Sequence, residues 1–363
     1  MKILEVIPNL QAGGAETFIV NLSNALASNE DNEVTILTLY HPNESEFLRG
    51  RIDKRVKVVS LNKHMGIDIR MLFSVLRFVK QENFDIAHFH VQAIIYSLLS
   101  CFFVRKTKYF ATIHNDAFKE ATGVHRLARK ILFKLKLCKA ITISSDSGNS
   151  FKDLYNVPST LIYNGVQRFN KSIDNNLRNR FKTSANVKLF VNAASFIGKK
   201  NQLAIARATN KLRNEGYPIK TILLGKVWDE NYYRQVKREE SEAVIIIGEV
   251  SNPIDYMAVS DFFILPSFYE GMPISLLEAM SVGCVPIVTP VGGCKNVVND
   301  GHNGLICPSP EEADVYKAMK KAMSLKDEQL QSIRKNISSD FEKYTIDKCA
   351  ELHMKLFENA ITN

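Results

Sequence analysis

The sequence lacks the features of a membrane-spanning or disulfide-bonded secreted protein. No apolar run approaches the length of about 18 residues that a transmembrane helix needs. The opening MKILEVIPNL is interrupted at Pro8, too soon for a secretory signal. The six cysteines form no C-x-x-C pair and no zinc-like spacing. We therefore expect a cytosolic protein whose cysteines are small buried residues.

Internal repeats and low-complexity segments are also absent. What is present is an ordinary globular composition: 363 residues, of which 45% are hydrophobic and 23% charged. This length predicts two domains of about 150 residues or more, each with its own core. The net charge of +9 favours an anionic partner, such as a phosphorylated substrate, a phospholipid surface or nucleic acid.

Short apolar or β-branched runs alternate with longer helical patterns along the whole chain. Such runs are typical of parallel strands that are covered by helices on both faces, so we expect an α/β protein. The expected strands of the first half are Lys2–Ile7, Glu33–Leu39, Val56–Leu61, Asp85–His88, Lys108–Ile113, Ala140–Ile143 and Thr160–Tyr163. Those of the second half are Val187–Ala193, Lys220–Leu224, Ala243–Ile247, Phe262–Leu265, Val285–Val288 and Gly304–Ile306.

The polar stretch 167–184, which reads QRFNKSIDNNLRNRFKTS, interrupts this alternation. It predicts a linker between an N-terminal domain of residues 1–166 and a C-terminal domain of residues 185–342. The remaining residues, 343–363, have the apolar spacing of a helix.

The segment Phe262–Gly283 combines a buried strand, a loop and a helix. Pro273 fits the first helical position, and Gly283 fits the residue just after the helix. Glu270 falls in the loop and Glu278 in the helix, and carboxylates accept hydrogen bonds from sugar or ribose hydroxyls. The spacing of the two acids alone fits solvated side chains equally well.

Free amides near Gly271 and Met272, at the start of this helix, would form an anion site. The whole run PSFYEGMPISLLEAMSVGCVPIVTPVGG resembles the donor-binding signature of the retaining family 4 glycosyltransferases of GT-B fold. Further matches, in chain order, are GGAE at 13–16, DIAHFH at 85–90, ATIHND at 111–116, ITISS at 141–145 and IYNGV at 162–166. The resemblance thus covers nearly the whole chain.

This resemblance implies two Rossmann-like domains that face each other across a cleft, with the C-terminal helix returning to the N-terminal domain. It implies transfer of a hexose from a nucleoside diphosphate sugar, with UDP favoured, and retention at the anomeric carbon. Glu278 would bind the ribose and Glu270 the hexose. The resemblance assigns further donor contacts to Gly248, Val250, Gly271, Met272 and Ile274.

Two other matches would contact the donor diphosphate. The pair Gly13–Gly14 precedes a helix, and by itself it is only a weak sign of a phosphate-binding turn. In VNAASFIGKKNQ, Lys200 matches the lysine of the family, but Ser195 stands where the family usually carries arginine. The neighbouring Lys199 is the residue that could replace the charge of that arginine.

His114 follows an expected strand at the end where α/β sheets place ligands, and the resemblance implies a position near the transferred sugar. Together with Glu270 and Lys200 it makes up the expected catalytic set. His88 and His90 lie on one face of a strand, but no third ligand follows at a readable spacing. We therefore expect no metal and no other cofactor.

The segment 124–140 reads VHRLARKILFKLKLCKA and carries Arg126, Arg129, Lys130, Lys134 and Lys136 among apolar residues. A basic amphipathic segment fits an anionic membrane surface, and it equally fits a helix that packs its apolar face on the sheet. We expect peripheral attachment at the inner face of the plasma membrane.

Acceptor and activity leave alternatives open. A saccharide acceptor that is linked to lipid, in surface polysaccharide assembly, suits the basic charge, and a soluble acceptor remains an alternative. A sugar-nucleotide epimerase of similar shape, or a silent nucleotide-sugar-binding subunit suggested by Ser195, are the competing functions. We expect no nucleic-acid binding, because the basic residues are not interleaved with exposed aromatic residues in a known module.

Overall fold

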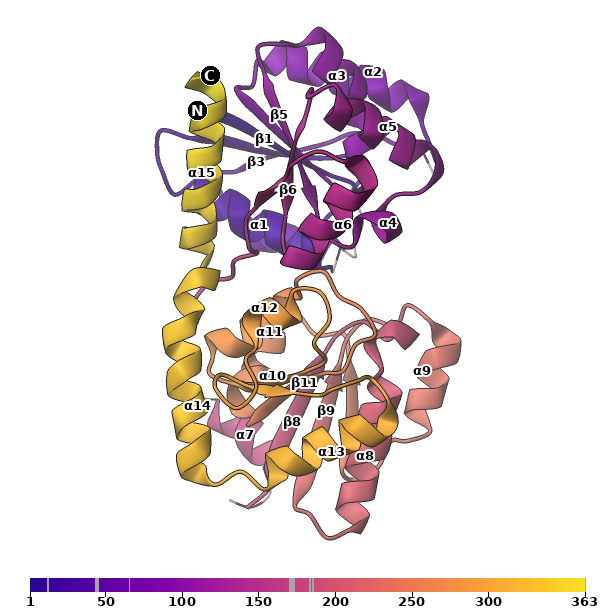
Figure 1. Cartoon of the computed structure of the whole chain (residues 1–363), viewed down its shortest axis with the longest axis vertical. Helices are drawn as coiled ribbons and strands as arrows, with labels where there is room; N and C mark the ends of the chain where they lie inside the picture. The colour runs from indigo at the N-terminus through magenta and orange to yellow at the C-terminus, as the bar shows by residue number, and fades with distance from the viewer. Residues whose placement is uncertain are drawn as a thin grey trace. The chain divides into compact units, whose positions relative to one another are not determined.

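The computed structural model of the chain describes residues 1–11, 13–42, 46–64, 66–169, 174–182, 184 and 186–362 (Figure 1). It divides into two compact units. The first unit comprises Met1–Val166 together with Lys343–Asn363, and the second comprises Gln167–Glu342. The C-terminal segment therefore belongs to the same unit as the N-terminus.

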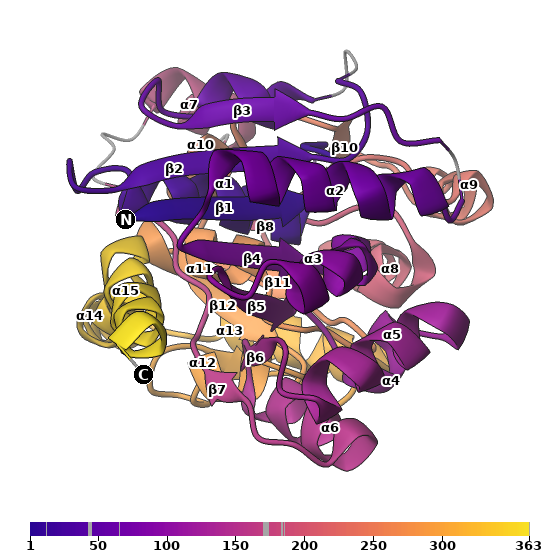
Figure 2. The same ribbon diagram turned by 90° about the horizontal axis from the view of Figure 1, so that it is seen from above.

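A parallel sheet forms the centre of the first unit, with the strand order β3-β2-β1-β4-β5-β6-β7 (Figure 2). Its strands are β1 (Lys2–Ile7), β2 (Glu33–Thr38), β3 (Lys57–Ser60), β4 (Ile86–His90), β5 (Lys108–Ile113), β6 (Lys139–Thr142) and β7 (Thr160–Leu161). Its α-helices are α1 (Gly14–Leu26), α2 (Ile69–Glu82), α3 (Leu98–Phe103), α4 (Ala117–Glu120), α5 (Gly123–Lys134), α6 (Ser145–Tyr155) and α15 (Ile346–Thr362).

Alternate residues of β1 and β4 belong to different environments, because successive side chains of a strand point to opposite faces. The apolar core shared with α2, α5 and α6 contains Leu4, Val6, Ala87 and Phe89. Glu5 and His88, which lie between these residues, contact each other and not that core. The ring of His88 lies 5.6 Å from that of His353, which belongs to α15. The centre of the sheet thus has one apolar face and one face with a buried polar cluster.

The second unit has its own parallel sheet, with the order β10-β9-β8-β11-β12-β13. The strands are β8 (Lys188–Ala193), β9 (Ile219–Leu224), β10 (Val244–Gly248), β11 (Phe262–Leu265), β12 (Val285–Val288) and β13 (Leu305–Ile306). The α-helices are α7 (Asn175–Phe181), α8 (Gln202–Asn214), α9 (Glu230–Lys237), α10 (Pro253–Val259), α11 (Ile274–Ser281), α12 (Cys294–Val297), α13 (Glu312–Met323) and α14 (Asp327–Asp340). Short 3-10 helices lie at Phe47–Arg51, Val91–Ser97, Gly198–Lys200 and Phe341–Tyr344.

Both sheets have the strand order of a Rossmann fold, 3-2-1-4-5-6 when the strands are numbered within each unit. The first unit adds β7 at one edge. The order reverses between β1 and β4 in the first unit and between β8 and β11 in the second. Open parallel sheets bind ligands beyond the carboxyl ends of their strands at such a point.

Every strand that the sequence predicts is present, with end points that differ by a few residues. The largest extension that matters for the site is in β4, which runs to His90 rather than ending at His88. Phe89 and His90 pair with Ala111 and Thr112 of β5, and this pairing extends β4 by two residues.

The predicted linker 167–184 is wrong in part, because residues 175–181 form helix α7 of the second unit. Asp174 caps this helix by accepting hydrogen bonds from the amides of Asn176 and Leu177. Lys182, just after the helix, lies 2.8 Å from a carboxylate oxygen of Asp261. Residues 170–173, 183 and 185 of the predicted linker region and its border lie outside the described residues.

The chain enters α15 through a close contact with the end of the first domain. The Val166 amide donates to the Tyr344 carbonyl at 3.0 Å, and the Ile346 amide donates to the Val166 carbonyl at 2.9 Å. Gly165 makes this approach feasible: a Cβ atom there would lie 2.7 Å from the Thr345 carbonyl oxygen. The C-terminal helix is thus fixed to the sheet by a backbone contact that only glycine permits.

Alanine in place of Gly165 should therefore destabilise the first unit. Besides the Thr345 carbonyl, the new methyl group would meet Cβ of Cys349 at 2.8 Å. Overpacking of this kind costs about 1–3 kcal/mol, so thermal unfolding should show a Tm lower by several degrees. Gly50→Ala is the matched control, because no heavy atom lies within 4 Å of its added Cβ. Equal Tm values for the two variants would contradict this account.

Candidate functional site

Lys200 and Glu270 form an ion pair at the point where the second sheet reverses its strand order. Lys200 ends the short 3-10 helix after β8, and Glu270 lies in the loop after β11. The Lys200 Nζ atom lies 2.6 Å from Glu270 Oε1 and 2.8 Å from Oε2. The Ser267 hydroxyl donates to the same Oε1 at 2.6 Å. Two residues of the expected catalytic set are therefore in direct contact.

Lys200 and Glu270 each keep a hydrogen-bonding position for a ligand. Both side chains are largely buried, with 18% of Lys200 and 8% of Glu270 exposed. An ammonium group has three N–H donors, and bonding to one carboxylate leaves a donor for a phosphate or sugar oxygen. The Glu270 carboxylate in turn keeps lone pairs for a hydroxyl. The neighbouring Lys199 has a different partner, since its Nζ lies 5.0 Å from the ring centre of Tyr269.

Backbone contacts between three loops hold this pair in place. The Phe268 amide donates to the Lys199 carbonyl at 2.9 Å, and the Thr289 hydroxyl donates to the Ser267 carbonyl at 2.6 Å. Gly292 has a φ of +52°, and a Cβ atom there would lie 2.0 Å from the Glu270 carbonyl oxygen. The VGG sequence after β12 therefore lets its loop touch the backbone of the Glu270 loop.

Helix α11 and the loop just before it carry the other predicted donor contacts of this segment. Met272, Ile274 and Glu278 are all buried, with exposed fractions of 4%, 6% and 8%. Pro273 precedes the helix as its cap, one residue earlier than predicted, because its ψ of 121° is extended. Gly283 has a φ of +73° just after the helix, which confirms the predicted closing residue. The ribose role of Glu278 stays a prediction.

Ser195, Gly248 and Val250 lie at the same carboxyl edge of the second sheet. Ser195 follows β8, and its carbonyl accepts a hydrogen bond of 2.9 Å from the Gln202 side chain. Gly248 ends β10 with a φ of +87°, and its carbonyl accepts from the Gly225 amide at 2.8 Å. Val250 follows two residues later. Like the loop that carries Glu270 and buried Gly271, these residues follow the carboxyl ends of strands in the second sheet, whereas Glu278 lies within α11.

At the first predicted phosphate contact, Gly13 caps helix α1 and Gly14 is its first residue. A Cβ atom at Gly13 would lie 2.1 Å from Oε2 of Glu16, so the glycine leaves room for that carboxyl group. Burial raises the pKa of Glu16 to about 7. The carboxyl group of Glu16 therefore lies at a helix start where an incoming phosphate would also bind. The sequence interpretation treated Glu16 only as part of a motif.

His114 contacts His90 rather than standing alone after its strand. Its Nε2 lies 2.9 Å from His90 Nδ1, and His90 Nε2 lies 2.7 Å from Oε2 of Glu5. Burial is the main cause that lowers the pKa of His114 to about 3. Within the described residues, Glu5, His88 and His90 are the group whose ligand atoms lie close enough to hold a metal ion. Glu5 is the third potential metal ligand, which the spacing of His88 and His90 in the sequence did not reveal.

The basic segment 124–140 is not one continuous surface helix. Helix α5 ends at Lys134, Lys136 turns with a φ of +54°, and Lys139 begins β6. The prediction that Arg129 faces a membrane is wrong: it is 1% exposed and lies 2.9 Å from a carboxylate oxygen of Glu120. A buried guanidinium group must be paired, which explains its inward position.

Of the remaining basic side chains in this segment, one is hydrogen-bonded to backbone carbonyls and the lysines named below are exposed. Arg126 donates to the carbonyls of Ala121 and Phe118 at 2.9 and 2.8 Å. Lys130, Lys134 and Lys136 are exposed. Only part of the predicted membrane-facing charge is thus available at the surface.

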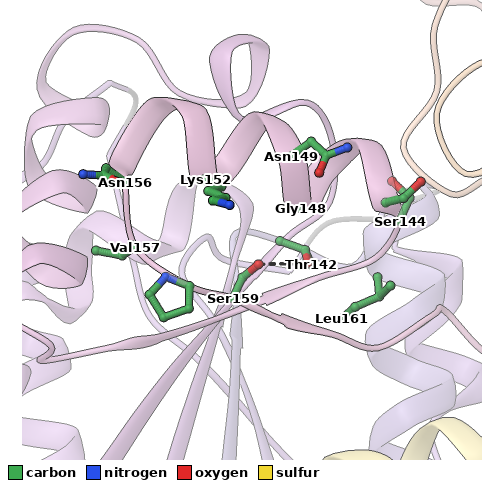
Figure 3. Close-up of a pocket in the computed structure, with 11 residues that line it drawn as sticks. Thr142, Ser144, Gly148, Asn149, Lys152, Asn156, Val157, Ser159 and Leu161 are labelled. Atoms are coloured by element: carbon green, nitrogen blue, oxygen red, sulfur yellow. Dashed lines mark hydrogen bonds between the residues drawn. The ribbon is translucent and has the colours of Figure 1, made fainter.

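A separate hollow of about 600 Å³ lies in the first unit beside α6 (Figure 3). Figure 3 shows Lys152 and Asn149 of α6 on one side and Ser159 hydrogen-bonded to Thr142 on the other, at 3.2 Å. None of the predicted site residues lines it. The structure therefore places the predicted residues in two groups, one in each unit, and neither coincides with this hollow.

Some residues of these groups could have been found in the sequence and others could not. Glu5 is an acid in the middle of an otherwise apolar strand, and that is a readable sign of a buried polar role. Ser267 and Glu120 carry no such sign, because their importance arises only from contacts with Glu270 and Arg129.

Two family models match the chain in succession. Residues 12–168 match the model described as Glycosyltransferase Family 4, and residues 174–340 match the model described as Glycosyl transferases group 1. Together the two models account for most of both structural units.

Relatives and a solved structure agree with these matches. The capsular polysaccharide biosynthesis glycosyltransferase CapH of Staphylococcus aureus is 24% identical over 79% of this chain and 81% of its own. A Campylobacter jejuni α-1,4-N-acetyl-D-galactosaminyltransferase, whose name gives an undecaprenol-linked saccharide as its substrate, is 23% identical over 89% of each chain.

The crystal structure of Anabaena HepE in complex with UDP has a TM-score of 0.81 and 16% identity over 99% of this chain and 100% of that one. This likeness concerns the fold, and with the two Rossmann-like units it confirms the expected GT-B architecture. The matches over both halves give the conclusion for the sequence as a whole: the chain is a glycosyltransferase, with a family 4 region as its first half and a glycosyl transferases group 1 region as its second half.

Proposed function

We propose that this glycosyltransferase transfers a hexose from UDP-hexose to a lipid-linked saccharide, with retention at the anomeric carbon, in surface polysaccharide assembly. The observation that carries the proposal is the Lys200–Glu270 pair at the strand-order reversal of the second sheet. A cation and a carboxylate at this position suit a ligand that carries both phosphate and hydroxyl groups.

Within this proposal the second unit binds the donor. Lys200 directs its remaining N–H at the diphosphate, Glu270 accepts from a hexose hydroxyl, and Glu278 accepts from the ribose. Lys200 stabilises the negative charge that develops on the departing diphosphate. Ser195 offers no positive charge, so Lys200 is the main cation of this unit on the phosphates.

For a retaining transfer, the environment of Glu270 favours a route without a covalent glycosyl-enzyme intermediate. Its carboxylate accepts from both Lys200 and Ser267, so it is better suited to accepting hydrogen bonds than to attacking carbon. Departure of the diphosphate and attack of the acceptor hydroxyl from the same face need no enzyme nucleophile. His114 of the first unit interacts with the reacting sugar and the acceptor hydroxyl.

The names of similar proteins support the chemical classes of donor and acceptor. HepE was crystallised with UDP, and the Campylobacter relative acts on an undecaprenol-linked saccharide. CapH acts in capsular polysaccharide biosynthesis. These names favour a UDP donor and a lipid-linked acceptor for the present chain.

The first prediction of this proposal concerns Lys200. Lys200→Ala should lower kcat by about 10²–10³-fold, the usual effect of losing one preorganised charge-stabilising donor. Lys200→Arg should recover part of the activity, because the charge remains. Release of UDP in the presence of a lipid-linked acceptor measures the rates. Thermal unfolding checks that each variant is folded, since loss of Lys200 leaves Glu270 without its cation.

Lys199→Ala is the matched control for that experiment. It removes an adjacent lysine whose ammonium group lies over the ring of Tyr269, so kcat should change by less than about tenfold. A folded Lys200→Ala enzyme of near-normal activity, or equal losses in the two variants, would contradict the assignment.

A second prediction is that transfer does not need a divalent ion. The carboxylate of Glu270 is already paired with Lys200, and the metal-like group of the described residues, Glu5 with His88 and His90, is internally hydrogen-bonded in the first unit. Treatment with EDTA should therefore leave the rate of UDP release unchanged. Loss of activity with EDTA and its return with manganese or magnesium would show that this picture of the diphosphate site is wrong.

Membrane attachment is supported by a surface of the first unit. Helix α3 packs between α2 and α5 (Figure 2). These helices carry large exposed apolar side chains, Ile69, Phe73, Phe103 and Leu127, with exposed fractions of 68%, 61%, 72% and 58%. Exposed basic residues on or beside the same helices are Arg70, Arg77, Arg105, Lys130 and Lys134.

Apolar anchors with basic neighbours are the composition that binds the surface of an anionic bilayer. In the part of the chain that the structure describes, no helix has the length and hydropathy to cross a membrane. We therefore propose attachment through this surface, which would place the active site near a lipid-linked acceptor.

Glutamine at Lys130, Lys134 and Lys136 should weaken binding to anionic vesicles roughly a hundredfold, since each basic residue near the lipid contributes about 1 kcal/mol. Cosedimentation with vesicles of phosphatidylglycerol measures this, and binding should also fall as salt rises. The control replaces three exposed basic residues of the second unit, Lys317, Lys335 and Arg213. Equal losses in both triple variants would indicate net charge rather than a defined surface.

A further inference from the structure

A chain of hydrogen bonds links Glu5 to His114 through His90, across three neighbouring strands of the first sheet. Glu5 Oε2 lies 2.7 Å from His90 Nε2, and His90 Nδ1 lies 2.9 Å from His114 Nε2. Glu5 and His90 have no exposed surface, whereas His114 is half-buried. The hydrogen-bond chain therefore runs from the interior of the sheet to its carboxyl edge.

We propose that Glu5 and His90 are positioning residues that decide which nitrogen of His114 carries its proton, and that Glu5 finally holds the proton lost by the acceptor hydroxyl. The catalytic part of this inference rests on the proposed function, in which His114 contacts the acceptor. The coupling of Glu5 to His114 does not depend on it.

The alternating donors and acceptors of the chain explain the coupling. A neutral imidazole donates through one ring nitrogen and accepts through the other. When Glu5 is ionised, it accepts from His90 Nε2–H, and His90 Nδ1 accepts from His114 Nε2–H. His114 Nδ1 is then an unprotonated acceptor. When Glu5 carries a proton and donates it to His90, both bonds reverse and His114 Nδ1 becomes a donor.

The second nitrogen of His114 is suited to meet a substrate. Among the described residues His114 Nδ1 has no hydrogen-bond partner, and it is not one of the buried unsatisfied atoms. His90 differs in this respect, because both of its ring nitrogens have partners within the protein. His114 is thus the end of the chain at which a hydroxyl group can bind.

The proposed proton transfer balances with glycosyl transfer. The acceptor oxygen bonds to the anomeric carbon while the bond from that carbon to the diphosphate oxygen breaks, and its electron pair stays on the diphosphate. The hydroxyl proton passes to His114 Nδ1, the Nε2 proton of His114 to His90 Nδ1, and the Nε2 proton of His90 to Glu5. The carboxylate becomes a carboxylic acid, and its proton returns to water after the product leaves.

The surroundings make Glu5 the proton-holding group of the cluster. Burial raises the pKa of Glu5 to about 8, with an opposing effect from His353. Burial lowers the pKa of His88 to about 3 and that of His353 to about 4, and it holds the pKa of His90 well below its usual value. The histidines that face Glu5 from β4 and α15 are therefore neutral near pH 7, where the carboxyl group can gain or lose a proton.

An ion pair on the other side of the sheet fixes the loops that follow His90 and His114. Arg129 donates to the Val91 carbonyl at 2.8 Å, directly after His90, and pairs with Glu120. Glu120 accepts from the Asn115 amide at 2.9 Å, directly after His114. Val91 has a φ of +46°, which is unfavourable for a β-branched residue. The buried ion pair therefore holds the backbone next to His90 and His114 in place, including the strained conformation of Val91.

The inference is tested on the full-length protein without substrates, by NMR of enzyme labelled with ¹⁵N at histidine. His114 signals are those that disappear in His114→Gln. In the wild-type protein, His114 should change from the Nδ1–H to the Nε2–H tautomer as pH rises through about 8, without becoming a cation. A single His114 tautomer from pH 6 to 10 would overturn the proposal, whatever the variants do.

Glu5→Gln keeps the shape of the side chain but cannot take up the proton. It should abolish the tautomer change of His114. With donor and acceptor present, it should also remove the rise of kcat/KM through pH 8 and lower kcat/KM at pH 9 about a hundredfold. Thr112→Val is the matched control, because it removes only the hydrogen bond of 2.7 Å to the far nitrogen of His88. Its His114 tautomer change should persist.

The remaining outcomes separate this inference from the proposed function. A His114 tautomer change in wild-type protein that transfers no sugar to any acceptor would support the coupling and remove the proposed function. Activity with an unchanged pH profile in Glu5→Gln would overturn the role of Glu5 and leave the proposed function intact. Stoichiometric metal in the purified protein, lost in Glu5→Gln, would overturn the relay, because the ring nitrogens would then be ligands.

Discussion

Both groups of functional residues depend on the reversal of strand order in a parallel sheet. Between β1 and β4, and again between β8 and β11, neighbouring strands continue into loops that diverge, which leaves space beyond their carboxyl ends. Lys200 and Glu270 meet across one of these points, and Glu5 meets His90 across the other. Residues that are 70 and 85 positions apart in the chain become partners because the topology places their strands side by side.

Three of the acids that lie largely away from water have partners of different kinds. Glu270 is paired with a lysine, Glu120 with an arginine, and Glu5 only with neutral imidazoles. Glu5 has no permanent cation beside it, and burial raises its pKa to about 8. The first two pairs therefore fix geometry, and Glu5 can change its charge. This difference follows from the partner residues, since all three acids are shielded from solvent.

The strands and the donor segment could be predicted from sequence because their signals are local. Apolar runs gave every strand, and the positions of Glu270, Gly283 and α11 follow from one continuous motif. The predicted linker was wrong where Phe181 and Lys182 find partners in the second unit, since a polar sequence does not reveal a distant Asp261. The prediction that Arg129 faces a membrane failed for the same reason. Its helix pattern fits a surface, and only the position of Glu120 shows that the side chain points inward. Composition and spacing therefore did not predict the contacts between segments that are far apart in the chain.

The serine at position 195, where the family usually carries arginine, affects how the Lys200–Glu270 pair would bind a diphosphate. In the loops of the second sheet, Lys200 is balanced by Glu270, and Lys199 lies over an aromatic ring. A diphosphate that binds at Lys200 therefore meets an ion pair and not a lone cation, so its attraction depends on the direction of the donors as well as on positive charge. Direction requires rigid loops, and the contacts of Gly292, Thr289 and Phe268 with the loops that carry Glu270 and Lys200 supply that rigidity. The glycine and hydroxyl residues around the ion pair are therefore as necessary to the proposed donor site as the charges themselves.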